Sequence, residues 1–233
     1  MSAADMREIY RRYAAGRPDL HGILLPDLLP HDVCGASPAP GRIRVLFVAE
    51  SPPWAAGRHD IAGPPDCLSP GYPYFYNDHY DAGRRRAGAP LSGSLAENLF
   101  TLLGLDGGTR RENLALFSGK GCYLVDTIRC VFRKNRKTAI PADLIRVSAR
   151  EILAREFKAL SPDYVVALGK TALAGLREIE PCASALRDAE KITAIGADRR
   201  EHHLLCLPYP GGRNRRYLDT IESGFRTIRD LLP

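Results

Sequence analysis

The chain has 233 residues, of which 45% are hydrophobic and 26% are charged, and its formal net charge is +6 at pH 7. This length allows one large α/β domain or two small ones with a substantial core. No apolar stretch reaches the roughly 18 residues that a transmembrane helix needs, and the N-terminus lacks the apolar core of a signal peptide. The composition therefore excludes a membrane-spanning protein and predicts one that works in the cytoplasm, without a membrane partner.

Six cysteines are spread along the sequence without a C-x-x-C pair. Two of them, Cys122 and Cys206, lie inside apolar runs that are typical of strands. This pattern predicts reduced, mostly buried thiols rather than a framework of disulfides.

Much of the positive charge is concentrated in basic clusters, at residues 84–86, 133–137, 199–200 and 213–216. A solvated loop would explain any one of them. Together they favour a polyanionic partner such as nucleic acid.

At the N-terminus, apolar residues at helical spacing predict a short helix over about 4–13. We expect residues up to about 40 to form a helical extension of a single domain that spans 1–233.

The first predicted strand leads to a candidate site. The five apolar residues of Val45–Ala49 predict a strand that is buried on both faces. Glu50 and Ser51 follow it, and two prolines then turn the chain outward. In open α/β sheets, ligands bind at the carboxyl ends of the strands. Glu50 and Ser51 are therefore candidate catalytic residues, although Glu50 could also merely cap the next loop.

Residues 51–91 are rich in proline and glycine, and they contain the aromatic run Tyr74, Phe75 and Tyr76. A long irregular segment inside a compact domain is often functional. The rings could stack on a flat base or simply pack against the loop. A helix is expected directly afterwards, over 92–105.

The remaining elements complete the predicted fold. Strands are expected over 121–125, 164–168 and 203–207, and helices over about 141–160, 170–178 and the C-terminal residues from about 213. Buried strands that alternate with helices predict an α/β fold: a three-layer α/β/α sandwich with a central, mostly parallel four-stranded sheet. The polar ends of its strands should converge on one edge, where a ligand would bind.

Two carboxylates, Glu50 and Asp126, end successive strands at that edge. Such a pair can activate water, stabilise a developing cation or bind a metal. Metal is the weaker alternative because no histidine lies at a strand end with ligand spacing. Asp126 could equally serve a structural hydrogen bond.

The other strand ends hold candidate anion-binding residues. Gly169-Lys170-Thr171 opens a helix directly after a strand, which presents N–H groups and a cation to a phosphate, although the upstream glycine of a P-loop is missing. The last strand ends at Pro208, and Arg213, Asn214, Arg215 and Arg216 lie near the start of the final helix. Cations there oppose the helix dipole. A negatively charged ligand would explain them, and a solvent-exposed arginine tract is the alternative.

Five motifs in the same order resemble the uracil-DNA glycosylase superfamily, most closely its thermostable iron–sulfur branch. That branch has roughly G-E-A-P-G, P-F-V-G, I-T-N-V-V-K-C with N-R, L-G-x-T-A and H-P-x-x-x-x-R. The counterparts here are A-E-S-P-P at 49–53, Y-F-Y-N at 74–77, L-V-D-T-I-R-C at 124–130 with N-R at 135–136, L-G-K-T-A at 168–172, and L-P-Y-P-G-G-R at 207–213. The likeness extends from about residue 42 to 216 and implies the fold of that superfamily.

The resemblance implies a DNA glycosylase that flips a base into this site and hydrolyses its N-glycosidic bond without a cofactor. Glu50 matches the glutamate that positions or activates the attacking water. One of Tyr74, Phe75 and Tyr76 matches the aromatic residue that stacks on the base.

The resemblance also implies how DNA is held. Gly169, Lys170 and Thr171 match a contact to the DNA backbone, and the segment from Pro208 to Arg216 matches a loop that enters the minor groove. The implied partner is single- or double-stranded DNA, bound by a monomer.

The chain departs from the superfamily at several positions. Leu207 stands where a histidine supports the leaving base, and Ser51 stands where relatives have Ala, Asp or Asn. Asp126 replaces the asparagine that reads uracil; an ionised carboxylate only accepts hydrogen bonds, so it favours a base with an amino group, such as cytosine or a modified cytosine. Cys130 matches one ligand of the iron–sulfur cluster, but its partners are missing, so no cluster is expected.

Two other functions stay open. A non-catalytic DNA-binding member of the superfamily that senses modified bases would account for the lost histidine. A hydrolase of free nucleosides or nucleotides would use the same carboxylates but would leave the arginine-rich loop without a role. Binding that weakens steeply as salt rises would indicate a polymer as the partner.

Overall fold

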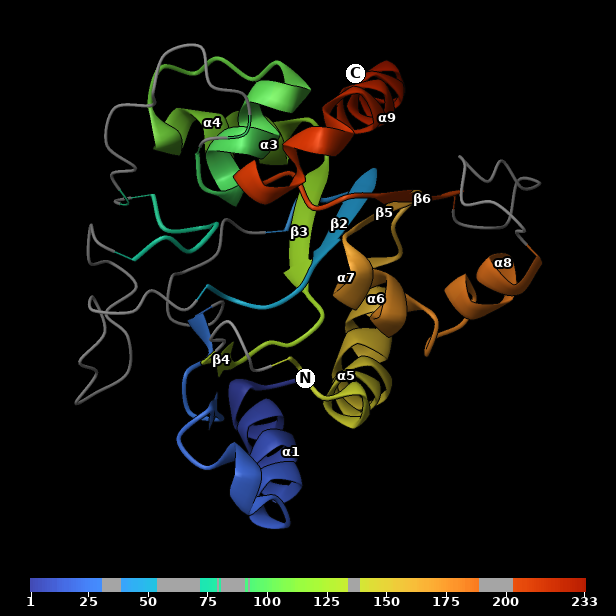
Figure 1. The fold of residues 1–233 in the computed structure, drawn as a ribbon. Coiled ribbons are helices and arrows are strands. Elements are labelled where there is room, and N and C mark those ends of the chain that lie inside the picture. Colours follow the sequence, from blue (N-terminus) through green and yellow to red (C-terminus); the bar gives the residue numbers. More distant parts are fainter. Residues whose placement is uncertain are drawn as a thin grey trace.

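The computed structural model describes residues 1–30, 39–53, 72–78, 80, 91, 93–133, 139–188 and 203–233. Among these residues, four strands form one parallel sheet in the order β3-β2-β5-β6. The strands are β2 (Val45–Ala49), β3 (Cys122–Asp126), β5 (Tyr164–Leu168) and β6 (His203–Leu207). Because all of them run in the same direction, their carboxyl ends lie at one edge of the sheet (Figure 1). The predicted parallel sheet is confirmed.

Helices cover both faces of this sheet (Figure 1). One layer consists of α3 (Leu95–Leu103), α4 (Arg110–Gly119) and α9 (Leu218–Leu231). The other consists of α5 (Ala142–Ser148), the π-helical turn η2 (Ala149–Leu153), α6 (Ala154–Leu160) and α7 (Lys170–Leu176). The predicted three-layer α/β/α sandwich is therefore confirmed.

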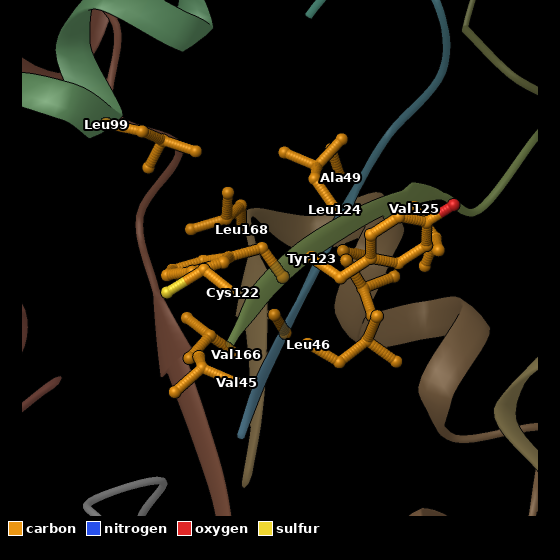
Figure 2. Close-up of a cluster of buried hydrophobic side chains, with 14 of the residues drawn as sticks. Val45, Leu46, Ala49, Leu99, Cys122, Tyr123, Leu124, Val125, Val166 and Leu168 are labelled. Carbon is orange, nitrogen blue, oxygen red and sulfur yellow. The ribbon is translucent and has the colours of Figure 1, made fainter. Parts of the chain in front are cut away.

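Apolar side chains of the strands fix the sheet between these layers. Every residue of β2 and β3 is buried, and Figure 2 shows their side chains gathered with those of β5. Phe47 of β2 stacks on Phe225 of α9, with ring centroids 6.1 Å apart, and lies 5.7 Å from the ring of Phe117 in α4. Burying each such ring contributes about 1.5–3 kcal/mol. This packing holds the strand ends at their edge.

The C-terminal helix begins later than its sequence suggested. A 3₁₀ segment, η3 (Gly212–Tyr217), contains the arginines, and α9 starts at Leu218. Ile221, Phe225 and Ile228 form its buried face. Within the described part of the chain, no helix combines the length and apolar character needed to cross a membrane.

The N-terminal residues pack on the loop that follows β3. Helix α1 (Ala3–Ala15) begins at a capping box formed by Ser2 and Asp5. A short strand β1 (Leu24–Leu25) pairs antiparallel with β4 (Val131–Phe132). Side chains from these elements share an apolar cluster that includes Tyr10 and Cys130.

Some elements went unpredicted. Two-residue strands such as β1 and β4 are too short for a period to be recognised. Helices α4 and α8 (Cys182–Asp188) were missed as well. Pro141 occupies the N-cap position of α5 rather than its first helical position.

The cysteines that fall within the described ranges, Cys122, Cys130, Cys182 and Cys206, are free thiols. All but the half-buried Cys206 are buried. This agrees with the predicted reduced, mostly buried thiols, while Cys34 and Cys67 lie outside the described residues.

Candidate active site

The site is centred on Glu50, directly after β2. Strand β2 lies between β3 and β5, and the next described helices after β2 and β5, α3 and α7, belong to opposite layers. Such a switch in direction opens a crevice where ligands bind in open α/β sheets. Thr171, in the first turn of α7 after β5, donates a hydrogen bond of 2.6 Å to Oε2 of Glu50 across this point.

Two glycines let α7 approach closely enough for this contact. Gly169 has a φ of +91°, and a Cβ atom there would lie 3.3 Å from the Cβ of Tyr209. Gly175 lies one turn after Thr171, and a Cβ atom there would lie 2.5 Å from Cγ2 of Thr127. A larger residue at Gly175 would push α7 outward, so the packing of Gly175 on Thr127 keeps Thr171 within reach of Glu50.

Asp126 is the last residue of β3 and pairs in register with Ala49, the residue before Glu50. Its exposure is 4%, and no hydrogen bond found among the described residues ends on its carboxyl oxygens. Burial raises the pKa of its carboxyl to about 7; the positive charge of Arg129 opposes this rise, and the negative charges of Glu156 and Glu50 add to it. Within the part of the chain that the structure describes, no partner for a structural hydrogen bond of this carboxyl is found.

Arg129 lies in the loop beyond Asp126 and is 3% exposed. Its guanidinium forms a two-pronged ion pair with Glu156 of α6, with Nη2–Oε1 at 2.5 Å and Nε–Oε2 at 2.9 Å. Its third nitrogen, Nη1, is buried and has no hydrogen-bond partner within the described ranges. The negative charge of Asp126 also acts on this guanidinium, and the hydroxyl of Tyr74 lies near enough to interact with it electrostatically.

Buried hydroxyl groups fix the backbone of the loop after β3. The N–H of Arg129 donates to the hydroxyl of Tyr10 (2.7 Å), which is hydrogen-bonded to Ser148 (2.7 Å). Ser148 in turn donates to the carbonyl of Thr127 (2.6 Å). The N–H and hydroxyl of Thr127 both donate to the carbonyl of Ala49, at 2.9 and 2.7 Å. These bonds link α1 and α5 to the ends of β2 and β3.

Tyr209 lies close to the two carboxylates, whereas the sequence placed it only within the DNA-binding segment 208–216. It is 37% exposed, yet enough protein surrounds it that burial, and then the charges of Asp126 and Glu50, raise the pKa of its hydroxyl. Its backbone is held, since its carbonyl accepts from Asn214 (2.8 Å) and that of Pro210 from Asn98 (2.8 Å). An aromatic residue between two prolines at a strand end was the available signal.

The structure separates the three aromatic candidates. Phe75 packs among core rings, 5.1 Å from Phe117. The hydroxyl of Tyr76 donates to the carbonyl of Leu124 (3.1 Å) and accepts from its N–H (2.8 Å), so it completes the outer edge of β3. Tyr74 is buried, its ring lies 6.1 Å from that of Tyr76, and its hydroxyl lies near enough to Arg129 to interact with it electrostatically. Tyr74 is therefore the aromatic candidate with the clearest link to the site.

Arg110 of α4 holds this aromatic segment in place. Its guanidinium donates to the carbonyls of Tyr74 (2.7 Å), Phe75 (2.9 Å) and Asn77 (2.6 Å). It also forms an ion pair with Glu97 of α3, which is largely buried. The segment is thus fixed by one buried cation rather than by regular secondary structure.

The candidate DNA-contacting residues fall into two groups. Lys170 is exposed at the start of α7, and Arg213, Arg215 and Arg216 are exposed on η3. The side chains of Thr171 and Asn214 instead bond to Glu50 and to the carbonyl of Tyr209. Ser51 and Pro208 are half-buried beside the strand ends. Clusters 84–86 and 199–200, and residues 134–137, lie outside the described residues.

Leu207, which the sequence resemblance aligned with a histidine, belongs to the core. It is buried, and a Cβ atom on Gly224 of α9 would lie 2.3 Å from its Cδ2. Leu207 thus packs against α9.

The absence of a metal cluster stays a prediction. In the described ranges, no three His, Cys, Asp or Glu side chains come together in a way that could hold a metal ion. Cys130 lies in the apolar cluster beneath α1, where burial raises the pKa of its thiol well above the ordinary value.

Comparison with known proteins adds one finding. The sequence profile of the Uracil DNA glycosylase superfamily matches residues 70–232. This stretch includes Asp126, Thr171 and Tyr209. Glu50 precedes the stretch, and its hydrogen bond with Thr171 is what places it beside these residues. A search of curated proteins finds no match.

Proposed function

Because the chain belongs to the uracil-DNA glycosylase superfamily, we propose that it hydrolyses the N-glycosidic bond of a base flipped out of DNA into the crevice at the ends of β2, β3 and β5. The observation that carries this proposal is the position of Glu50, which Thr171 holds at the switch point beside the carboxyl of Asp126. Carboxylates placed next to a sugar can activate water and stabilise the positive charge that develops on the ring.

In this proposal Glu50 acts on water. Its carboxylate accepts a proton from the water whose oxygen attacks C1′ of the sugar. The bond from C1′ to the base nitrogen breaks, and its electron pair leaves with the base. The hydrogen bond from Thr171 fixes the carboxylate for this step, and no cofactor takes part.

In this proposal Asp126 reads the base. Tyr74 is the favoured stacking residue, and Phe75 and Tyr76 are the less favoured candidates. A carboxylate accepts hydrogen bonds from an amino group and repels the O4 of uracil. Leu207 offers no hydrogen bond to the leaving base. We therefore propose a damaged or modified base, rather than ordinary uracil, as the substrate. Asp126→Asn should raise activity on uracil-containing DNA, and an unchanged base preference would contradict this role.

DNA is held by cations around the crevice. Lys170 and the arginines at 213, 215 and 216 are exposed and would contact phosphates. The loop from Pro208 to Gly212 would enter the minor groove, with Tyr209 nearest to the flipped base. We propose that the protein does this as a monomer.

The test uses short duplexes and single strands that contain uracil, hypoxanthine, cytosine or modified cytosines. After incubation with the protein, alkali reveals abasic sites as strand breaks. Breaks at one base that disappear in Glu50→Gln support the proposal. Glu178→Gln is the matched control, because that carboxylate is ion-paired to Arg150 and absent from the groups that act on Asp126.

The other outcomes point elsewhere. Binding without breaks on every substrate would favour a non-catalytic sensor of modified bases, for which the apolar Leu207 is the supporting observation. If the protein neither binds nor cleaves any of the substrates, the proposal of a nucleic-acid partner is overturned. Breaks that persist in Glu50→Gln would remove Glu50 from the reaction.

A further inference from the structure

We propose that Arg129, held by Glu156, is a positioning residue that determines base specificity. By its charge, it sets whether Asp126 meets the base as a carboxylate or as a carboxylic acid. The carboxylate form accepts bases with an amino group, and the acid form also accepts bases with a carbonyl group in its place. This inference rests on the proposed function and defines the substrate class of the same site.

The first observation is a pair of unpartnered polar groups in a buried place. Asp126 is 4% exposed, and no hydrogen bond found among the described residues ends on its carboxyl oxygens. The Nη1 of Arg129 is buried and has no partner within the same residues. Each unsatisfied buried group costs roughly 1–3 kcal/mol, so most buried polar groups are paired. An unpaired carboxyl at the site edge is explained if a ligand supplies its partner.

The second observation is how the charge of Arg129 is balanced. The carboxylate of Glu156 binds two of its guanidinium nitrogens. The negative charge of Glu156 therefore partly offsets the effect of the positive charge of Arg129 on Asp126. Because Nη1 is fully buried, Arg129 acts on Asp126 by charge, while a base would meet Asp126 itself. Arg129 is therefore a positioning residue and makes no contact with the substrate.

The groups whose charges act on Asp126 come from several elements. Arg129 lies in its own loop, Glu156 on α6 and Glu50 after β2. The hydroxyls of Tyr209 after β6 and Tyr76 in the aromatic segment also interact with its charge. Burial outweighs the attraction of Arg129, so the pKa of Asp126 is raised to about 7. Both forms of the carboxyl are then populated near neutral pH.

The two forms present different hydrogen-bonding groups. A carboxylate has two accepting oxygens, which suit the amino group of cytosine and repel the O4 of uracil. A carboxylic acid has one O–H donor and one accepting oxygen, as an amide has, so it can pair with either edge. The proton comes from solvent, and no bond in the substrate changes in this step.

The experiment compares two substrates that differ in one group. It uses the amino-bearing base that is excised best and its deaminated counterpart in the same duplex, under single-turnover conditions from pH 5.5 to 8.5. We expect the rate ratio of carbonyl to amino base to rise at least about 10-fold as the pH falls, since one good base contact discriminates by this much or more. Effects of Glu50 cancel in the ratio because both substrates share it.

Variants assign the effect to residues. Asp126→Asn should give a ratio that does not change with pH. Glu156→Gln removes a negative charge and leaves Arg129 uncompensated, so the midpoint of the ratio should move to lower pH. Glu178→Gln, the distant ion-paired control, should leave the midpoint in place. If Glu156→Gln does not fold, the Asp126→Asn series still decides the question.

Several results would overturn the inference. The first is a rate ratio that does not change with pH in the unaltered protein. The second is a rate ratio that still changes with pH in Asp126→Asn. The third is a midpoint that stays in place in a folded Glu156→Gln variant. If no base is excised, the glycosylase proposal fails by itself. The same pH series is then measured as the ratio of the two duplexes' dissociation constants, where a pH-dependent ratio supports the inference and a flat one overturns it.

Discussion

The hydroxyl of Thr171 and the carboxylate of Glu50 meet at 2.6 Å between two adjacent parallel strands. They are 121 residues apart in the sequence. A hydrogen bond to a charged group is worth about 1.5–3 kcal/mol, enough to hold the carboxylate in one orientation. A catalytic carboxylate benefits from such positioning because the attacking water must be aligned with the sugar.

Thr171→Val removes this hydrogen bond and preserves the shape of the side chain. We expect the single-turnover rate to fall roughly 10- to 100-fold, as the strength of a charge-assisted hydrogen bond implies, while DNA affinity changes little. Thr227→Val makes the same chemical change at an exposed position of α9 and should leave the rate as it is. Equal rates for the two variants would show that the Thr171 contact is not used.

Asp126→Asn should change how stability depends on pH. The folded protein keeps the proton of Asp126 up to about pH 7, whereas the unfolded chain releases it near the ordinary pKa of 3.8. The folded state thus binds more protons between these values, and its stability falls as pH rises through this range. The Asn variant does not lose stability in this way, so above pH 7 its free energy of unfolding should exceed that of the unaltered protein by up to roughly 4 kcal/mol.

The measurement is urea denaturation of both proteins at pH 4 and pH 8. The variant should be the more stable one at pH 8, and the difference should nearly vanish at pH 4. A difference of the same size at both pH values would mean that Asp126 does not titrate in this window.

Arg110→Ala should loosen the aromatic segment and destabilise the protein. The variant leaves the largely buried Glu97 without its cation, and three backbone carbonyls lose their donor. Removing one partner of a buried ion pair lowers the free energy of unfolding by about 3–5 kcal/mol. The neighbouring Arg111 pairs with Asp78 but is 73% exposed, so Arg111→Ala should cost at most about 1 kcal/mol. Free energies of unfolding from urea titrations compare the two, and similar values would contradict the assigned role of Arg110.

Replacing Arg213 and Arg215 with alanine should weaken DNA binding without altering base choice. Each lost phosphate contact lowers the slope of log affinity against log salt by about 1. Arg226→Ala, at an exposed position on α9, removes the same charge away from the strand ends and serves as the control. Fluorescence anisotropy at several salt concentrations measures the slopes, and a changed base preference would instead place these arginines in the pocket.

The parallel sheet was predictable because its signal is local. A buried strand needs a short run of apolar residues, and β5 and β6 have the bounds that their sequences predicted. The order of helices and strands then limits the topology to few arrangements. The position of Glu50 at a strand end follows from the same local signal.

The partners of the site residues were not predictable in this way. Arg129 and Glu156 lie 27 residues apart on different elements, and no spacing rule joins them. The aromatic run Tyr74-Phe75-Tyr76 has one composition but several environments, since Phe75 enters the core and Tyr76 completes the edge of β3. Tyr209 lies near enough for the charges of Asp126 and Glu50 to act on its hydroxyl, and Asn98 and Asn214 anchor the loop after β6 that carries it.

The sequence by itself determined the α/β architecture and the residues that end each strand, because hydrophobic periodicity and turn residues act over a few positions. The tertiary structure alone decided which of those residues meet and in what state of charge. The protonation of Asp126 depends on how deeply β3 is buried and on charges from α6 and the end of β2. Those distances arise only when the layers pack, because the chemistry of the site comes from side chains that are remote along the chain.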